Sequence, residues 1–115
     1  MSQKKVTISV YELTGSPLCV ASDDGQKVYD QIAEAIPHRS VILSFKNVTG
    51  LTSAFLNAAI GQLYGPFDHK TIRERLTIVD MEPDDLALLK RVVETAKQYF
   101  KDPKRFDNAV DEALS

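Results

Sequence analysis

A short apolar run, residues 41–45 (VILSF), constrains the fold of this 115-residue chain more than any other segment. The run follows Pro37 and ends at a polar turn, so it is bounded in the way that strands usually are. An almost wholly apolar strand is typical of the middle of a sheet, because a strand with one face in water alternates apolar and polar residues. The run therefore predicts a central strand with helices on both of its sides.

Patterns typical of strands occur on either side of this run. Residues 6–11 alternate between apolar and polar side chains, which predicts a first strand with one buried face. Residues 18–21 (LCVA) follow a Gly-Ser-Pro turn and could form a second strand that returns as a hairpin. Residues 76–79 (LTIV) predict a further short strand that ends at Asp80.

Helical patterns separate these strands. Apolar residues at helical spacing predict helices over residues 24–36 and 53–64, and a longest helix that opens at residues 82–85 and ends before Asp102. Residues 65–75 are polar and contain Gly and Pro, which indicates a connection. Residues 103–115 have one apolar face, which fits either a packed terminal helix or a surface for a partner. Strands that alternate with helices predict an α/β fold with a small mixed sheet.

Composition indicates one soluble domain. A chain of 115 residues is near the commonest domain size, so we expect a single domain over 1–115 with its core in about 5–100. The sequence has 14 Lys and Arg against 16 Asp and Glu, which gives no reason to expect a nucleic-acid partner. No apolar run approaches the length of a membrane span and no signal peptide is evident, so we expect a cytoplasmic protein without a membrane partner. Cys19 is the sole cysteine, so an internal disulfide and a multi-cysteine metal site are excluded, and we expect no cofactor.

The segment VILSFKNVTGLTSAFLNAAIGQLYG, residues 41–65, resembles the strand–turn–helix core of STAS domains, a group that includes the anti-sigma factor antagonists. The similarity is closer still to a bacterial STAS-like family of unknown function, whose members have a similar strand, a Thr-Ser turn and a Phe-Leu-Asn helix start. The resemblance implies a STAS-like α/β fold, with helices packed against a small sheet. It also implies a non-enzymatic regulatory module that binds other proteins.

The resemblance singles out the turn before the predicted second helix. In anti-sigma factor antagonists a serine in this turn is phosphorylated by a kinase of the histidine-kinase-like ATPase superfamily. The alignment of motifs places Ser53 at the phosphoacceptor position and Thr52 at the position of an aspartate. The implied partner is a histidine-kinase-like ATPase or an anti-sigma-type protein. From the residues alone, Thr52 or Ser53 is also expected to cap the helix that follows.

Three neighbours of this turn are further candidates. Phe55 and Asn57 follow it on the predicted helix and are interface candidates. Asp80 ends a strand at the edge of the sheet where α/β folds commonly bind ligands. This position supports an alternative function, a small ligand-binding domain or enzyme with a cleft near Ser53 and Asp80. We assign no catalytic residue, because the sequence around Ser53 lacks the G-x-S-x-G elbow of serine hydrolases.

Two charged clusters and the terminal segment complete the candidates. A cluster of acidic residues follows the predicted strand 76–79, and it is better explained by the positive start of a helix than by a metal site. The basic cluster could meet a phosphate or an acidic surface. A homo-oligomer built through residues 103–115 is a third functional hypothesis. The acidic cluster comprises Asp80, Glu82, Asp84 and Asp85, and the basic cluster comprises His69, Lys70, Arg73 and Arg75.

Overall fold

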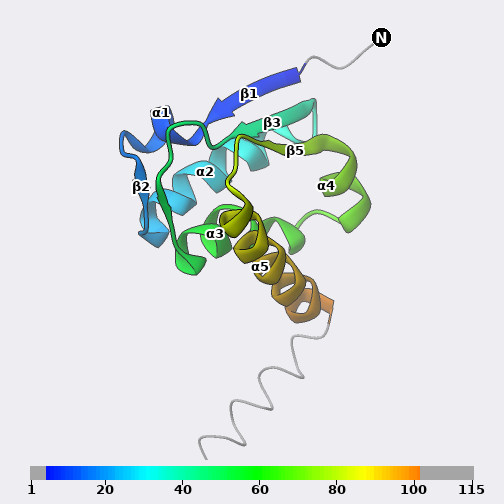
Figure 1. Cartoon of the computed structure of the whole chain (residues 1–115). Helices are drawn as coiled ribbons and strands as arrows, with labels where there is room; N and C mark the ends of the chain where they lie inside the picture. The colour runs from blue at the N-terminus through cyan, green and yellow to red at the C-terminus, as the bar shows by residue number, and fades with distance from the viewer. Residues whose placement is uncertain (1–4, 102–115) are drawn as a thin grey trace, which may run out of the picture.

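The computed structural model describes residues 5–101, which fold into two small sheets and the helices around them (Figure 1). The predicted segment 103–115 lies outside the described residues. In chain order the elements are β1 (Lys5–Ser9), α1 (Val10–Thr14), β2 (Leu18–Cys19), α2 (Ser22–Ala35), β3 (Ser40–Ser44), β4 (Gly50–Leu51), α3 (Ser53–Ala59), a 3-10 helix η1 (Gly61–Tyr64), α4 (His69–Arg75), β5 (Leu76–Val79) and α5 (Pro83–Lys101).

The apolar run forms the middle strand of the larger sheet, as the sequence predicts. The strand order is β1-β3-β5, and both neighbours run parallel to β3. Val41 lies between Val6 and Leu76, and Leu43 lies between Ile8 and Ile78. The α/β class is therefore confirmed, but all strand pairs of the described residues are parallel, so the sheet is not mixed.

The two faces of this sheet differ, and for the described residues 5–101 the prediction of helices on both sides is wrong. Val41 and Leu43 are fully buried, whereas Ile42 points to the other face and is only partly buried. Directly across from Ile42 lie Thr7 and Thr77, and both threonines are exposed. Figure 1 shows α2, α3 and α5 together on one side of the sheet. A single isoleucine on the open face made the run resemble a strand covered twice.

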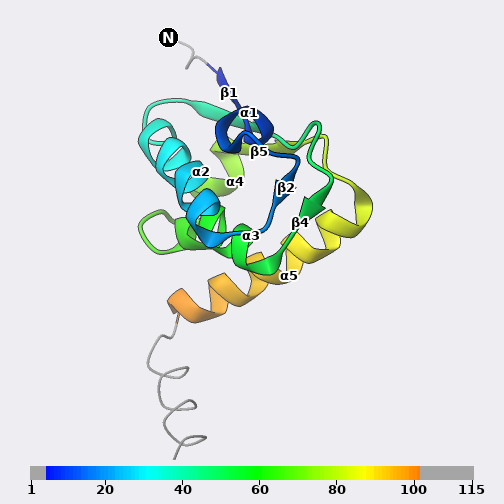
Figure 2. The same cartoon turned by 90° about the vertical axis from the view of Figure 1, so that its left-hand side faces the viewer.

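The second sheet replaces the predicted hairpin. β2 pairs with β4 in parallel, with Leu18 opposite Gly50 and Cys19 opposite Leu51 (Figure 2). The hairpin prediction is wrong because a short helix, α1, separates β1 from β2. Ser9 caps α1 by accepting a hydrogen bond from the Glu12 amide at 3.1 Å. The predicted strand 6–11 therefore ends at Ser9, and its last two residues are helical.

The helices also depart from the simple pattern in their bounds. The predicted helix 53–64 is α3 followed by η1, because the chain leaves α-helical geometry at Ile60, where φ is −119°. The predicted connection 65–75 contains α4, which Asp68 caps through a 2.7 Å hydrogen bond from the Thr71 amide. Ile72 of α4 is buried in the core, which explains why so polar a segment is ordered as a helix.

α5 packs against α3 and η1 with a narrower stripe than the sequence suggests. Its buried residues are Leu89, Val92 and Ala96, whereas Leu86 and Phe100 remain 46% and 39% exposed. Residues at i, i+3 and i+7 share one side of a helix, which explains the observed stripe. Among residues 5–101, no helix is long and apolar enough to cross a membrane.

α2 and α3 approach each other closely because Gly25 lies between them. A β-carbon at Gly25 would come within 2.5 Å of the Phe55 carbonyl oxygen and 2.8 Å of the Ala58 side chain. Only glycine fits such a contact without a shift of backbone. This packing fixes the position of α3 against the core, and therefore the position of the turn that precedes it.

Candidate functional site

The turn between β4 and α3 is held by Thr52. Its backbone is extended, and its hydroxyl oxygen accepts a hydrogen bond from the Phe55 amide at 3.2 Å. The same hydroxyl donates to the carbonyl oxygen of Val20 at 2.7 Å. Thr52 is therefore the N-cap of α3, and it also joins the start of this helix to the end of β2.

Ser53 is the first residue of α3 and has a different environment. Its side chain is exposed, and it forms no hydrogen bond within the part of the chain that the structure describes. The capping role that the sequence left open between two residues thus belongs to Thr52. The Ser53 hydroxyl remains accessible to another molecule.

A groove between α3 and α5 begins at Ser53. Its volume is about 500 Å³, and its lining combines small, apolar and polar side chains with one cation. A second hollow of about 430 Å³ shares Asn57 and Thr95 with it and continues toward Phe100. The groove is lined by Ser53, Ala54, Asn57, Leu88, Arg91, Val92 and Thr95.

The structure brings only some of the predicted site residues to this groove. Ser53 and Asn57 line it, whereas Phe55 is fully buried and supports the turn from the core. Asp80 is not among its lining residues. Asp80 follows β5 in a left-handed conformation with φ of 60°, which aspartate tolerates better than most residues. Its carboxylate accepts a hydrogen bond from the Ser44 hydroxyl at 3.1 Å, which joins the ends of β3 and β5.

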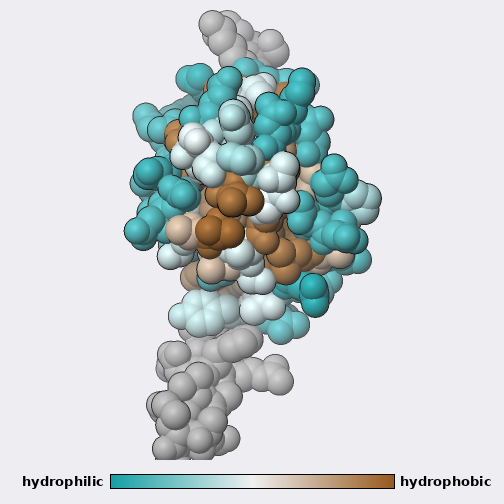
Figure 3. All heavy atoms as spheres, turned by 60° about the vertical axis from the view of Figure 1, so that its left-hand side comes forward, coloured by the Kyte–Doolittle hydropathy of each residue, from teal (hydrophilic) through white to brown (hydrophobic). Residues whose placement is uncertain are grey.

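Exposed apolar side chains at β2 and just after it lie next to the Thr52 turn, and sequence analysis missed them. Leu18 is 56% exposed and Val20 is 51% exposed, although Cys19 between them is fully buried. Leu51 on the paired strand is partly buried beside them. Figure 3 views this side of the molecule and shows a patch of apolar side chains framed by hydrophilic ones. The sequence does contain a sign of these exposed side chains: residues 18–21 are all apolar, although a strand with one buried face needs apolar residues only at alternate positions.

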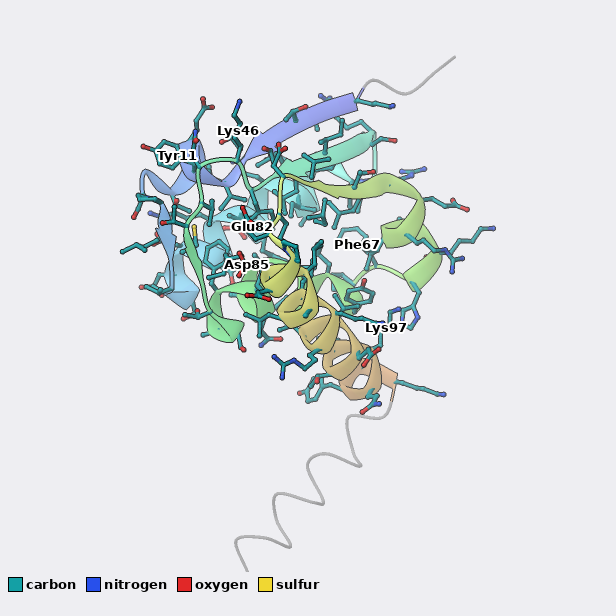
Figure 4. The ribbon with its side chains drawn as sticks, in the orientation of Figure 1. Tyr11, Lys46, Phe67, Glu82, Asp85 and Lys97 are labelled. Atoms are coloured by element: carbon teal, nitrogen blue, oxygen red, sulfur yellow. The ribbon has the colours of Figure 1, made fainter. Side chains whose placement is uncertain are left out.

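Carboxylates lie at two helix starts that are close in sequence to residues of this surface. Asp23 and Asp24 are in the first turn of α2, directly after β2, and Asp84 and Asp85 are in the first turn of α5. Figure 4 shows Asp85 at the beginning of α5. The pKa of the Cys19 thiol is raised, chiefly by burial, and the charge of Asp24 adds to the rise while a hydrogen bond with Thr14 opposes it. Cys19 is thus a protonated core residue and not a nucleophile.

The basic cluster lies apart from the groove, on α4. His69, Lys70 and Arg73 are exposed, but Arg75 is occupied within the fold. Its guanidinium donates to the carbonyl oxygens of Ile36 and Pro37 at 2.9 and 2.8 Å. Arg75 therefore holds the end of α2 and is not available to a phosphate in the way the sequence suggested.

The acidic cluster is divided by the structure. Asp80 bonds to Ser44, whereas Asp84 and Asp85 belong to the helix start, where the positive end of the helix dipole favours them. Across residues 5–101, no three His, Cys, Asp or Glu side chains gather closely enough to hold a metal ion.

Comparison with known proteins identifies the family. A family model described as a STAS-like domain of unknown function matches residues 24–86, which span α2 to the first turn of α5. The chain belongs to this STAS-like family. The match includes the Thr52–Ser53 turn and α3, and the predicted resemblance is confirmed. No curated protein and no solved structure matches the chain significantly.

Proposed function

We propose that this STAS-like protein is a non-enzymatic regulatory module that binds another protein through the surface around Ser53. We call this the groove surface and define it by Leu18, Val20, Ser53, Ala54, Leu88 and Arg91. One observation carries the proposal: the exposed apolar residues Leu18 and Val20 are joined, through the hydrogen bond from Thr52 to the Val20 carbonyl, to the turn where a groove begins at the exposed Ser53. Exposed apolar side chains bordered by charged residues mark interaction sites in many proteins.

The alternative of a ligand-binding or catalytic cleft has less support. It requires Ser53 and Asp80 to share one site, but the residues that line the groove do not include Asp80. Among those residues Arg91 is the one with a charged side chain, and general acid–base catalysis needs a group that exchanges protons near neutral pH. Protein binding uses the apolar side chains that the groove does contain.

We further propose that phosphorylation of Ser53 regulates this binding, as it does in anti-sigma factor antagonists. A phosphoryl group would bring a charge of about −1.5 to −2 into a groove lined by Ala54, Leu88 and Val92. An apolar side chain of the partner would then have to cover a dianion, which costs desolvation energy. Phosphorylation is therefore expected to release a partner whose apolar side chains, and not its charged ones, lie over Ser53. The kinase we propose is a histidine-kinase-like ATPase, and the partner is an anti-sigma-type protein of the bacterial cytoplasm.

Co-purification from native cells with quantitative mass spectrometry tests this function. The tagged wild-type protein is compared with Ser53→Glu, which adds a negative charge in the groove, and with Gln31→Glu. Gln31 is exposed on α2 and does not line the groove, so this control adds the same charge elsewhere. We expect one partner to be lost by Ser53→Glu and retained by Gln31→Glu. Equal recovery of every protein with all three chains would contradict the proposal.

A further inference from the structure

We infer that the groove surface binds a cationic amphipathic helix of its partner, with apolar side chains against Leu18, Val20 and Leu88 and Lys or Arg side chains toward the surrounding carboxylates. This inference rests on the proposed function, because it names the chemistry of the partner at the same surface. It is carried by the apolar exposure, by the charges around it and by the shape of the groove.

The apolar residues of the groove surface can contact apolar side chains of a partner. Leu18 of β2 and Val20, just after it, are both exposed on either side of the buried Cys19, so their side chains project to the same face of this segment. Leu88 and Val92 project from α5 into the groove, one helical turn apart. Figure 2 shows β2 and β4 side by side, with the beginning of α5 next to β4. Apolar anchors at this surface would lose contact with water on binding, which is the main source of affinity.

The charges around these apolar residues are mainly negative. Asp23 and Asp24 follow Val20 closely, and Asp85 is three residues before Leu88, so it shares a side of α5 with that leucine. Asp84 lies next to it in the same turn. The cations close to them in sequence are Lys27, which pairs with Asp24 at 3.5 Å, and Lys90 and Arg91 on α5. Arg91 lies on the groove wall, whereas Lys90 is two residues from Leu88 and projects from the other side of the helix. A partner with Lys or Arg beside its apolar face is complementary to this arrangement.

The opposite end of α5 has the opposite charge. Figure 4 shows Glu82 and Asp85 where α5 begins and Lys97 near where it ends. Lys97 lies over the ring of Tyr64 at 5.7 Å, and Lys70 and Arg73 of α4 are exposed. The Lys and Arg side chains of a bound segment are therefore expected at the Asp84–Asp85 end of the groove and its uncharged residues at the Phe100 end. The distribution of charge thus favours one orientation of such a partner.

The shape of the groove suits a helix. The hollow at Ser53 and the hollow near Phe100 share Asn57 and Thr95, so they form one continuous depression along α5. Helices that bind in grooves insert apolar residues spaced at i, i+3 or i+4 and i+7. An elongated groove with two adjoining hollows fits a helix with apolar side chains at this spacing better than it fits a compact ligand.

A synthetic helical peptide of about 16 residues, roughly 24 Å long, is the probe for this inference. Its apolar face carries leucines and its flanks carry lysines, and a matched peptide has glutamate at every lysine position. Fluorescence anisotropy measures binding of each peptide to the full chain. We expect the lysine peptide to bind at least about tenfold more tightly at low salt, with the preference reduced as salt screens the charges. Equal affinity for the two peptides would overturn the inference.

Protein variants locate the binding site. Leu18→Ser is expected to lower affinity for the lysine peptide by about tenfold, which is roughly 1.4 kcal/mol. Leu86→Ser is the matched control, because Leu86 is also exposed but is two residues from Leu88 and projects from the other side of α5. Asp84→Asn with Asp85→Asn is expected to weaken binding, whereas Asp30→Asn with Glu34→Gln on α2 removes equal charge without effect. Equal losses of peptide affinity in the two double variants would overturn the inference.

Two measurements separate this inference from the proposed function. If neither peptide binds while Ser53→Glu still loses its partner in cells, the partner chemistry is wrong and the proposed function stands. Light scattering on the full chain tests a second copy as the occupant. A dimer that Leu18→Ser dissociates would assign the groove surface to self-association and overturn the inference.

Discussion

Two uncovered β-surfaces of this protein have opposite characters. The open face of the β1–β3–β5 sheet exposes Thr7 and Thr77 to water, whereas at the small β2–β4 sheet Leu18 and the adjoining Val20 are exposed. Within residues 5–101 neither surface is covered by a helix, yet only the first of them is polar. The difference fits our proposal that the apolar surface at β2, unlike the polar open face of the larger sheet, contacts a partner.

The largest effect is expected from substitution on the buried side of β3. Leu43→Ala removes a fully buried side chain and should lower the free energy of unfolding by about 2–5 kcal/mol. Ile42→Ala on the open face is the control, and it should cost clearly less because Ile42 is partly exposed. Urea unfolding followed by circular dichroism measures both. Equal losses would show that the two faces are equally covered.

A smaller loss of stability is expected at the turn that joins β2 to α3. Thr52→Ala removes the N-cap of α3 and the hydrogen bond to Val20, and should cost about 1–2 kcal/mol. Ser53→Ala should change stability by less than about 0.5 kcal/mol, because its hydroxyl has no partner in the described structure. Thermal unfolding of the two variants checks this, and a larger effect at Ser53 would reverse the roles assigned to them.

A substitution on the β2 surface is expected to weaken partner binding and to leave the free energy of unfolding nearly unchanged. Leu18→Ser should alter the free energy of unfolding by less than about 0.5 kcal/mol, because Leu18 is already mostly exposed. The same substitution should abolish capture of the native partner. If Leu18→Ser unfolds the protein instead, β2 is part of the core and the contrast between the two surfaces fails.

The smallest effect concerns pH and Cys19, which lies beneath this surface. Burial raises the thiol pKa in the folded protein, so the folded state disfavours the thiolate. Stability should therefore be constant below the pKa of the unfolded thiol and fall as the pH rises above it. Cys19→Ala should remove this part of the alkaline pH dependence. Unfolding titrations of both chains between neutral and alkaline pH measure the difference, and identical slopes would contradict it.

Local patterns predicted the regular parts of the fold. The apolar run at 41–45 predicted β3 within one residue, and the helix predicted over residues 24–36 matches α2 within two residues at each end. The Pro83 start of α5 was also expected, because proline suits the first turn of a helix. In each case neighbouring residues alone determine the element.

Elements that depend on distant residues were not predictable. β2 has a partner some thirty residues away in β4, and such pairing leaves no local signal. α4 is polar apart from Ile72, and its order depends on the core that this residue enters. The sequence located Ser53 and Thr52 through family resemblance, but it could not divide their roles, because the division depends on the contact between Thr52 and Val20.

The two hydrogen bonds of the Thr52 hydroxyl have a consequence for the entropy of binding. One oxygen fixes the first turn of α3 and, at the same time, the end of β2. The β2 and α3 parts of the groove surface are thereby already held in place, so a partner that binds does not have to immobilise them. A preorganised receptor loses less conformational entropy on binding, so even a modest contact area can support a useful affinity.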